Sequence, residues 1–306
     1  MRFEGILAAL TTPFARDGSV ALDSFRENLA RYNRTHLSGY VVVGSTGESV
    51  LLTFDEIDRI WSAAREFAAP GKLLIAGVGV DSTSETIARA QRAAKLGYDA
   101  VLVKTPHYFK SLLTPAALDR HYLAVADASP VPVLIYSIPQ YTGISITAEW
   151  VASLAEHPNI VGIKESSGNV QLASEIIHLC PPEFSTLVGS SGTLFLSSLM
   201  GAAGGILALA CFLPEPAIEI FEAVRAGDTA RASRLQFSLL APSRKIAGEL
   251  GPTGVKYAMD CVGYYGGGPR LPLLPLTEAQ KKTVESILAE SIARQKLDHL
   301  GVALKG

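Results

Sequence analysis

The feature that most constrains this chain is a repeated alternation of short apolar runs with helical patterns. The runs are apolar throughout, which is typical of strands buried on both faces of a parallel sheet. Eight candidate strands occur, at residues 5–10, 40–43, 73–78, 100–103, 133–136, 160–163, 185–188 and 205–209. Eight such units within about 225 residues fit a (β/α)8 TIM barrel better than an open doubly wound sheet.

Capping signals mark the helices between the strands. Thr53 with Glu56, and Ser82 with Glu85, have the spacing of a capping box, in which two side chains satisfy the first backbone N–H groups of a helix. Gly97 stands where a glycine commonly ends a helix. These signals support helices that cover the predicted sheet.

Three further helical patterns follow the eighth predicted helix, which spans residues 215–226. They lie at residues 229–248, 253–262 and 277–295. We therefore predict a barrel at residues 1–226 and a C-terminal helical domain at 227–306 that packs on the barrel.

Composition and charge exclude several classes of protein. The 306 residues carry a formal net charge of −2 and contain no cluster of Lys and Arg, so neither nucleic acid nor a membrane is an expected partner. The start of the chain lacks the apolar segment of a signal peptide, and the most apolar run, 201–213, is shorter than the roughly 20 residues that span a bilayer.

The cysteines and histidines give no sign of a metal. Cys180, Cys211 and Cys261 are odd in number and widely spaced, so we expect reduced, buried thiols in a cytoplasmic protein. The six histidines lack the spacing of metal ligands. We predict neither a zinc site nor a disulfide framework.

A lysine directly follows two of the predicted strands, as Lys104 and Lys164. Active sites of TIM barrels form at this carboxyl end of the strands. Burial lowers the pKa of a lysine, and a neutral amine attacks carbonyl carbons. The alternative for either lysine is a side chain that extends to water. The local pattern does not choose between the two.

Two hydroxyl residues stand between glycines after the second predicted strand, in Gly44-Ser45-Thr46-Gly47-Glu48. Such a turn presents backbone N–H groups and hydroxyl donors, which suit a carboxylate or a phosphate. The alternative is an ordinary turn, where Ser, Thr and Gly are also common. Glu48 could serve as an acid or base, or could complement the dipole of the next helix.

Two tyrosines, Tyr108 and Tyr136, lie at the ends of the fourth and fifth predicted strands. A tyrosine there is usually a packing residue with a satisfied hydroxyl, but two of them near a lysine on the next strand are less usual. His107 alone is weak evidence for a site. The glycine-rich segments 77–82 and 266–269 lack the full fingerprint of a dinucleotide or phosphate loop.

Taken together, the motifs at four strand ends resemble the pyruvate-dependent class I aldolase family, whose members include dihydrodipicolinate synthase, N-acetylneuraminate lyase and 4-hydroxy-2-oxoglutarate aldolase. The matching motifs are Gly44-Ser45-Thr46-Gly47-Glu48, Thr105-Pro106-His107-Tyr108, Tyr136-Ser137-Ile138-Pro139 with Thr142-Gly143, and Gly162-Ile163-Lys164-Glu165-Ser166. Their order and spacing fit along nearly the whole chain. The resemblance implies a homotetrameric barrel with a C-terminal helical domain, which acts on pyruvate without a metal or other cofactor.

The resemblance also assigns roles to individual residues. It makes Lys164 the lysine that forms the Schiff base and sets Lys104 aside. It makes Tyr136 the general acid and base, with Ser45 and Tyr108 as partners in the proton relay, the latter usually lent across a dimer interface. The residues that it places against the substrate are Ser45, Thr46, Gly47, Ser166 and Leu207, of which Ser45 and Thr46 hold the carboxylate of pyruvate and Leu207 is an apolar residue of the pocket.

The choice of aldehyde rests on departures from the family pattern. Tyr141 stands where dihydrodipicolinate synthase has an arginine for the carboxylate of its aldehyde substrate, and a tyrosine cannot form a bidentate ion pair. Segments 254–256 and 259–267 are most similar to 4-hydroxy-2-oxoglutarate aldolase, although Thr46 replaces the asparagine of its animal form. We therefore expect cleavage of 4-hydroxy-2-oxoglutarate to pyruvate and glyoxylate. The alternatives are dihydrodipicolinate synthase, a lyase for a sugar acid such as N-acetylneuraminate or 2-keto-3-deoxygluconate, and a non-catalytic barrel that binds a keto acid.

Overall fold

The computed structural model describes residues 3–299 and the side chains of residues 3–296. Eight parallel strands close into a barrel in which each strand pairs with its neighbours in sequence and the last pairs with the first. The strands are β1 (Gly5–Ala9), β2 (Gly39–Val42), β3 (Leu73–Gly77), β4 (Ala100–Lys104), β5 (Val133–Ser137), β6 (Ile160–Glu165), β7 (Ser185–Val188) and β8 (Gly204–Leu207). The predicted (β/α)8 barrel is therefore confirmed.

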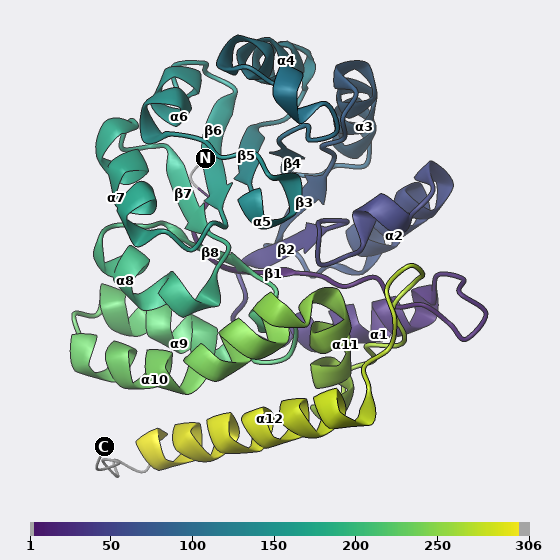
Figure 1. Cartoon of the computed structure of the whole chain (residues 1–306), viewed down its shortest axis with the longest axis vertical. Helices are drawn as coiled ribbons and strands as arrows, with labels where there is room; N and C mark the ends of the chain where they lie inside the picture. The colour runs from purple at the N-terminus through teal and green to yellow at the C-terminus, as the bar shows by residue number, and fades with distance from the viewer. Residues whose placement is uncertain (1–2, 300–306) are drawn as a thin grey trace.

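Helices surround the barrel, and a further group lies against one side of it (Figure 1). Those that follow the strands are α1 (Leu22–Tyr32), α2 (Phe54–Phe67), α3 (Thr83–Lys95), α4 (Pro115–Ala128), α5 (Pro139–Thr142), α6 (Ala148–Leu154), α7 (Val170–Leu179), α8 (Leu194–Leu199) and α9 (Pro214–Arg225). The C-terminal group comprises α10 (Thr229–Ala241), a π-helix η5 (Pro242–Glu249), α11 (Gly251–Cys261) and α12 (Glu278–His299). Four short 3-10 helices complete the elements: η1 (Ser49–Leu51), η2 (Lys110–Leu112), η3 (Ser191–Thr193) and η4 (Leu209–Cys211).

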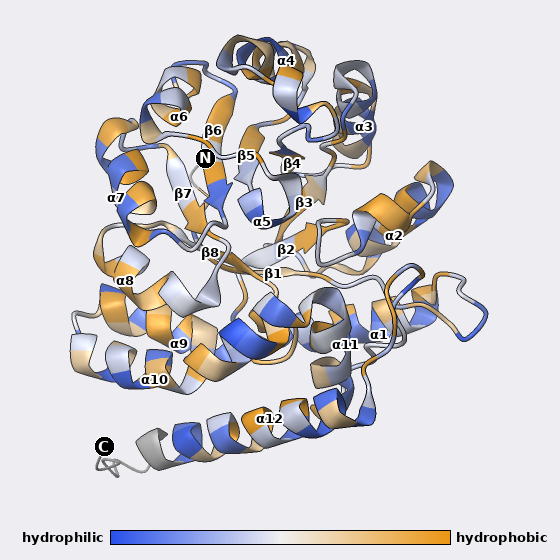
Figure 2. Cartoon of the chain, in the orientation of Figure 1, coloured by the Kyte–Doolittle hydropathy of each residue, from blue (hydrophilic) through white to orange (hydrophobic). Residues whose placement is uncertain are grey.

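Successive residues of the strands serve two different cores. In β1, Leu7 and Ala9 belong to the cluster inside the barrel, whereas Ile6 and Ala8 pack in the layer between strands and helices. This alternation follows from the strand geometry, in which neighbouring side chains point to opposite faces. Both faces are buried, which explains why strands such as β5 are orange in Figure 2.

Three strands extend beyond their predicted ends, and as a result Lys104 and Lys164 lie within strands. β4 ends at Lys104, β5 at Ser137 and β6 at Glu165, so the predicted end of the sixth strand was two residues short. The register aligns Tyr136 with Lys104 on one side and with Lys164 on the other. Residues in register on parallel strands share a face, and Tyr136 belongs to the inner cluster. Both lysines therefore leave the backbone toward the inside of the barrel.

The helix caps are formed largely as predicted. Thr53 and Glu56 make the complete capping box at the start of α2. The Ser82 side chain accepts a hydrogen bond from the backbone N–H of Glu85, but the Glu85 carboxylate pairs with Arg89 at 2.8 Å, so only half of that predicted box forms. Gly97, with φ of +80°, follows α3 as predicted.

The helix predicted at residues 229–248 is two elements. α10 ends at Ala241, and the wider turns of η5 begin at Pro242. A proline has no N–H for the helical hydrogen bond and its ring crowds the carbonyl four residues earlier. That carbonyl, on Ser238, instead accepts a hydrogen bond from the hydroxyl of Ser291 on α12 at 2.8 Å. The break at Pro242 is thus stabilised by packing against the last helix.

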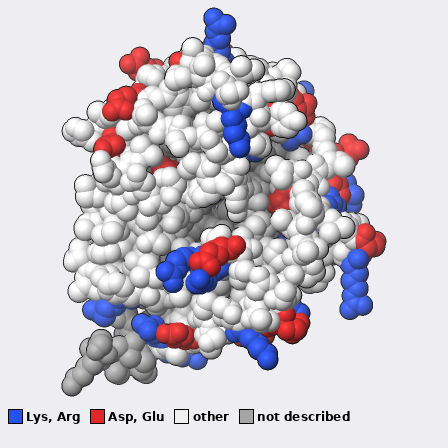
Figure 3. Space-filling model, in the orientation of Figure 1, with Lys and Arg blue, Asp and Glu red and all other residues white. Residues whose placement is uncertain are grey.

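The distribution of charged side chains and cysteines bears on several predictions made from composition. Figure 3 shows side chains of both signs scattered over one face, which is hollowed near its centre. All three cysteines are free, as expected, but Cys261 is exposed whereas Cys180 and Cys211 are buried. Within residues 3–299 no helix is long and apolar enough to cross a membrane, and no cluster of potential metal ligands occurs.

Candidate active site

Lys164 is the most strongly perturbed amine at the carboxyl end of the barrel. Its side chain is 4% exposed, and burial lowers the pKa of the amine to about 7. Its Nζ atom lies 4.4 Å from the centre of the Tyr136 ring. The nearly buried amine is thus held over an aromatic face, with a substantial neutral fraction at neutral pH.

Tyr136 presents its hydroxyl to the loop that follows β2. The phenol donates a hydrogen bond to the Oγ atom of Ser45, with a distance of 3.3 Å between the oxygens. Burial raises the pKa of Tyr136 to about 12, and the hydroxyls of Ser45 and Ser166 partly offset that rise. Tyr136 is therefore a protonated donor near pH 7, with hydroxyl neighbours that favour its phenolate.

The Ser45–Thr46 loop is a compact turn between two strained residues. Val43 and Glu48 have φ of +62° and +55°, a region that side-chain-bearing residues seldom adopt. Inside the loop, the Glu48 N–H donates to the Ser45 carbonyl at 3.0 Å. Among residues 3–299, the backbone N–H groups of Ser45 and Thr46 have no hydrogen-bond acceptor. The loop therefore offers two free N–H donors and two hydroxyls to an anion.

Glu48 is neither a free acid nor a simple dipole partner. Its side chain is fully buried and forms an ion pair with the equally buried Nζ of Lys256 on α11. The other carboxylate oxygen accepts a hydrogen bond from the backbone N–H of Arg270 at 2.9 Å. Local sequence does not connect these residues, which are more than 200 positions apart, so their contact was not predicted.

Close backbone approach brings the ends of β6 and β7 together. A Cβ atom on Gly189 would lie 1.8 Å from the Oγ of Ser166 and 3.2 Å from the Cε of Lys164. Only glycine fits there without displacing those side chains. The Ser166 carbonyl accepts a hydrogen bond from the Gln140 side chain at 2.5 Å. Gly189 and Gln140 thus define the wall next to the amine, and sequence analysis missed both.

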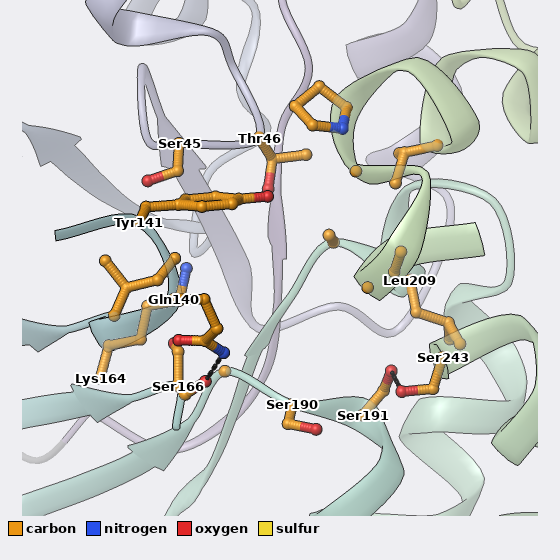
Figure 4. Close-up of a pocket in the computed structure, with 18 of the residues that line it drawn as sticks. Ser45, Thr46, Gln140, Tyr141, Lys164, Ser166, Ser190, Ser191, Leu209 and Ser243 are labelled. Atoms are coloured by element: carbon orange, nitrogen blue, oxygen red, sulfur yellow. Dashed lines mark hydrogen bonds between the residues drawn. The ribbon is translucent and has the colours of Figure 1, made fainter. Parts of the chain in front are cut away.

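A pocket of about 170 Å³ opens above Lys164. Figure 4 shows Ser45, Thr46 and Tyr141 on one side of it, and the hydroxyl side chains of the opposite wall on the other. That wall contains Ser190, Ser191 and Ser243. The rule that sites form at strand ends could have found the first two, which follow β7, but Ser243 comes from η5 in the C-terminal group.

The structure separates the remaining predicted residues from this pocket. Leu207 is buried in the layer between strands and helices, so its predicted place in the pocket was wrong; its neighbour Ile206 faces the inside of the barrel. Gly47 does not line the pocket; its carbonyl accepts a hydrogen bond from the hydroxyl of Thr12 at 2.7 Å. Tyr108 is 76% exposed and lies outside the pocket of its own chain.

Lys104 lies beside a smaller cavity, of about 40 Å³, that also contacts Ser45 and Tyr136. Burial lowers the pKa of Lys104, and the Asp81 carboxylate partly restores it. Asp81 also accepts hydrogen bonds from the backbone N–H groups of His107 and Tyr108, at 2.6 and 2.9 Å. Lys104 therefore has a counter-charge. Among residues 3–296 no carboxylate contributes to the pKa of Lys164, and the buried thiol of Cys211 only partly offsets the effect of burial.

A desolvated amine at the mouth of a TIM barrel, facing a phenol and an anion-binding turn, is the arrangement of a lysine-dependent aldolase. Sequence comparison agrees, because the model of the dihydrodipicolinate synthetase family matches residues 2–291. The chain belongs to this family, and it is accordingly a carbon–carbon lyase of the class I aldolase type.

Individual relatives match along their whole length. The 4-hydroxy-tetrahydrodipicolinate synthase of Xanthomonas axonopodis pv. citri is 37% identical over 297 residues, which are 97% of each chain. The structure of the synthase of that name from Methylacidiphilum fumariolicum has a TM-score of 0.92 at 30% identity and covers 98% of this chain and 99% of its own. The dihydrodipicolinate synthase of Acinetobacter baumannii, solved with pyruvate, has a TM-score of 0.90 at 30% identity and covers 94% and 98%.

Proposed function

We propose that this enzyme binds pyruvate as a Schiff base on Lys164 and makes or breaks a carbon–carbon bond to an aldehyde. The observation that carries the proposal is the buried Lys164 amine, whose pKa is lowered to about 7 and which lies 4.4 Å from the ring of Tyr136. An amine in this state is both nucleophilic and desolvated.

The chemistry begins with addition of the neutral Lys164 amine to the keto carbon of pyruvate. Loss of water gives an iminium, which withdraws electrons from the adjacent methyl carbon. Removal of a proton from that carbon gives an enamine, whose carbon attacks the carbonyl carbon of the aldehyde. Hydrolysis of the resulting iminium releases the product and restores the amine; cleavage follows the same steps in reverse.

Tyr136 is suited to move the proton at the aldehyde oxygen. Its pKa near 12 keeps the phenol protonated, so it can donate to the alkoxide that forms as the carbon–carbon bond closes. The Ser45 hydroxyl accepts from the phenol at 3.3 Å and links it to the loop after β2. In the cleavage direction the phenolate takes the proton back.

The Ser45–Thr46 loop supports binding of the pyruvate carboxylate. Its hydroxyls line the pocket that contains Lys164, and its free N–H groups can complete an anion site. A carboxylate held there places the neighbouring keto carbon within the pocket of the amine. Ser166, also on the pocket wall, supports the same placement.

For the aldehyde, we propose condensation of pyruvate with aspartate semialdehyde as the first candidate. It is supported by the names of relatives that are 33% and 37% identical and cover 94% and 97% of this chain. Cleavage of 4-hydroxy-2-oxoglutarate, the activity expected from sequence, is the second candidate. The observation that favours it is Tyr141, which lines the pocket in place of the arginine described above.

The Schiff base is tested by trapping with pyruvate and borohydride, followed by peptide mass spectrometry. We expect the reduced pyruvyl adduct on Lys164, and its loss in Lys164→Ala. Lys104→Ala is the matched control, because it removes the other inward lysine of the same row and should retain the adduct. An adduct on Lys104 in the unmodified enzyme would refute the assignment.

The two aldehydes are separated by measuring both reactions on one preparation. Condensation faster than cleavage favours the synthase, and the reverse order favours the 4-hydroxy-2-oxoglutarate lyase. Tyr141→Arg adds a cation to the pocket and should increase condensation with the carboxylate-bearing semialdehyde. An unchanged rate in that variant would show that the semialdehyde carboxylate lies elsewhere.

Tyr108 fits a relay only if a partner chain supplies it. It is exposed, packs edge-on against Phe109 with ring centres 5.0 Å apart, and is absent from the pocket of its own chain. We therefore propose a homotetramer in which Tyr108 completes the neighbouring site. We also propose that the enzyme is cytoplasmic and that it divides into a catalytic barrel at residues 1–226 and a helical domain at 227–306. Equilibrium sedimentation of the enzyme, and turnover by Tyr108→Phe, test the oligomer and the relay.

A further inference from the structure

We propose that Glu48 and Lys256 are a positioning pair through which the C-terminal helices hold the Ser45–Thr46 loop in the shape that binds pyruvate. The inference rests on the proposed function, since it assumes that this loop receives the carboxylate. Neither residue of the pair lines the pocket above Lys164, so neither touches the substrate or the reacting atoms.

The loop has a conformation that it would not hold alone. Val43 and Glu48 bound it, and both have positive φ. Residues in such regions persist only where their surroundings fix them. At the first boundary, Gly77 packs so closely on Val43 that an added Cβ would lie 2.2 Å from the Val43 carbonyl oxygen. The second boundary needs an equivalent support.

Glu48 receives that support from the C-terminal part of the chain. Lys256 pairs with one carboxylate oxygen, and the backbone N–H of Arg270 donates to the other at 2.9 Å. Lys256 is itself fixed: its Nζ donates to the Gly268 carbonyl at 3.0 Å and lies 4.2 Å from the centre of the Phe14 ring. Every polar atom at the end of the Glu48 side chain is thus held by residues 256–270.

The same helix reaches the pocket. Val255, next to Lys256 on α11, lines the cavity above Lys164. Arg270 also ties the segment to η1 and α2, which follow the loop, because its guanidinium donates to the Leu51 carbonyl at 2.9 Å and pairs with Glu56. The C-terminal helices therefore contribute to the site both directly and by holding the loop on its opposite side.

Loss of Lys256 would leave the Glu48 carboxylate buried without its paired cation, since the nearby guanidinium of Arg270 is paired with Glu56. An uncompensated charge in the interior is unfavourable, so the carboxylate must take up a proton or move toward water. Glu48 is two residues from Thr46, and its N–H donates to the Ser45 carbonyl at 3.0 Å, so its movement displaces the anion-binding groups. Lys164 lies on β6 and is not displaced with it, whereas Tyr136 on β5 keeps its place but loses its hydrogen bond to the Ser45 hydroxyl. In imine formation at Lys164 the expected defect is therefore one of pyruvate binding, separate from any loss of proton transfer at Tyr136.

The experiment compares Lys256→Met, Glu48→Gln and the double variant by borohydride trapping over a range of pyruvate concentrations, together with steady-state kinetics. Either single change should raise the half-saturating pyruvate concentration roughly tenfold or more, the worth of one hydrogen bond to a charged group. The maximum extent of labelling should stay within about threefold, since Lys164 is intact, whereas kcat should fall as well because Tyr136 loses its Ser45 partner. The double variant should bind pyruvate better than Lys256→Met, because it contains no unpaired buried charge.

Asp58→Asn is the matched control. Asp58 pairs with Arg92 between α2 and α3, at distances of 2.5 and 2.9 Å, and its contacts within residues 3–296 do not include the loop. It should leave the half-saturating pyruvate concentration unchanged even where it lowers Tm. Glu48→Gln retains an acceptor for the Arg270 N–H, and it decides the question where Lys256→Met does not fold.

Two results are distinguishable failures. An unchanged half-saturating concentration in Glu48→Gln and Lys256→Met, with a lower Tm, would show that the pair serves stability alone and would overturn the inference. Failure of pyruvate and borohydride to label Lys164 in the unsubstituted enzyme would instead overturn the proposed function.

Discussion

Raising the pH should switch on imine formation at Lys164 over a narrow range and then stop affecting it. Burial lowers the pKa of this amine from 10.5 to about 7, which corresponds to roughly 5 kcal/mol of lost stabilisation of the charged form. Only the neutral amine attacks pyruvate. Its fraction rises about tenfold between pH 6 and pH 8 and is nearly constant above that, whereas an ordinary lysine gains about a hundredfold over the same range and continues to gain toward pH 10.

The assay isolates the step that depends on the amine. The enzyme is mixed with subsaturating pyruvate for short times at each pH and quenched into borohydride at one fixed alkaline pH, so that reduction is the same in every sample. The Lys164 adduct is then counted by mass spectrometry. Tyr136, whose pKa is near 12, does not titrate in this window.

Lys104→Ala serves as the control, because burial also lowers the pKa of Lys104 and its titration must not account for the profile. The variant should keep the same midpoint near pH 7. A labelling rate that climbs tenfold with each pH unit through pH 9 would refute the reasoning, since it would show that burial does not hold Lys164 neutral.

Three further changes test the site. Tyr136→Phe should keep pyruvate trapping but lower turnover by about 10²–10⁴-fold, the usual worth of general acid–base help; equal loss of trapping would contradict its role in proton transfer. Gly189→Ala should reduce the extent of trapping, because its Cβ would lie 1.8 Å from the Ser166 Oγ and 3.2 Å from the Lys164 Cε; unchanged trapping would show that the wall relaxes. Lys164→Met should raise Tm, because the pKa of Lys164 is about 7 in the folded chain and 10.5 in the unfolded chain. The buried amine therefore destabilises the folded chain most at and below pH 7, where the gain in Tm should be largest, and this destabilisation disappears near pH 10.5. A gain in Tm that is independent of pH would not fit this cause.

Much of the architecture follows from sequence because the rules that govern it are local. Fully apolar runs specified eight buried strands, and Thr53 with Glu56 marked a helix start that the structure contains. The rule that active sites form at the carboxyl ends of barrel strands predicts that Ser45, Tyr136 and Lys164 lie at one end of the barrel. Local rules also explain the error at Leu207: side chains alternate faces along a strand, so an assignment displaced by one residue from Ile206 places the side chain in the wrong core.

The missed features depend on contacts between distant segments. The sequence around Lys256 predicts only a cation on a helix, and no neighbouring residue indicates that Lys256 has a buried partner 208 positions earlier. Ser243 enters the pocket because η5 begins at Pro242, and the pattern of residues 229–248 predicted a continuous helix instead. Both arise from the packing of the C-terminal helices against the barrel, which short-range periodicity does not encode.

The choice between the two inward lysines shows what the fold adds to the motif. Lys104 and Lys164 flank Tyr136 in one row of the barrel, and burial lowers the pKa of both amines. Burial alone therefore does not select the nucleophile. Asp81 lies near Lys104 and favours its charged form, whereas the group that favours the charged form of Lys164 is the thiol of Cys211, which burial keeps protonated. Among residues 3–296 no carboxylate opposes the effect of burial on Lys164, so pyruvate meets this amine largely in its neutral form, and this distinction is a property of the assembled strand ends.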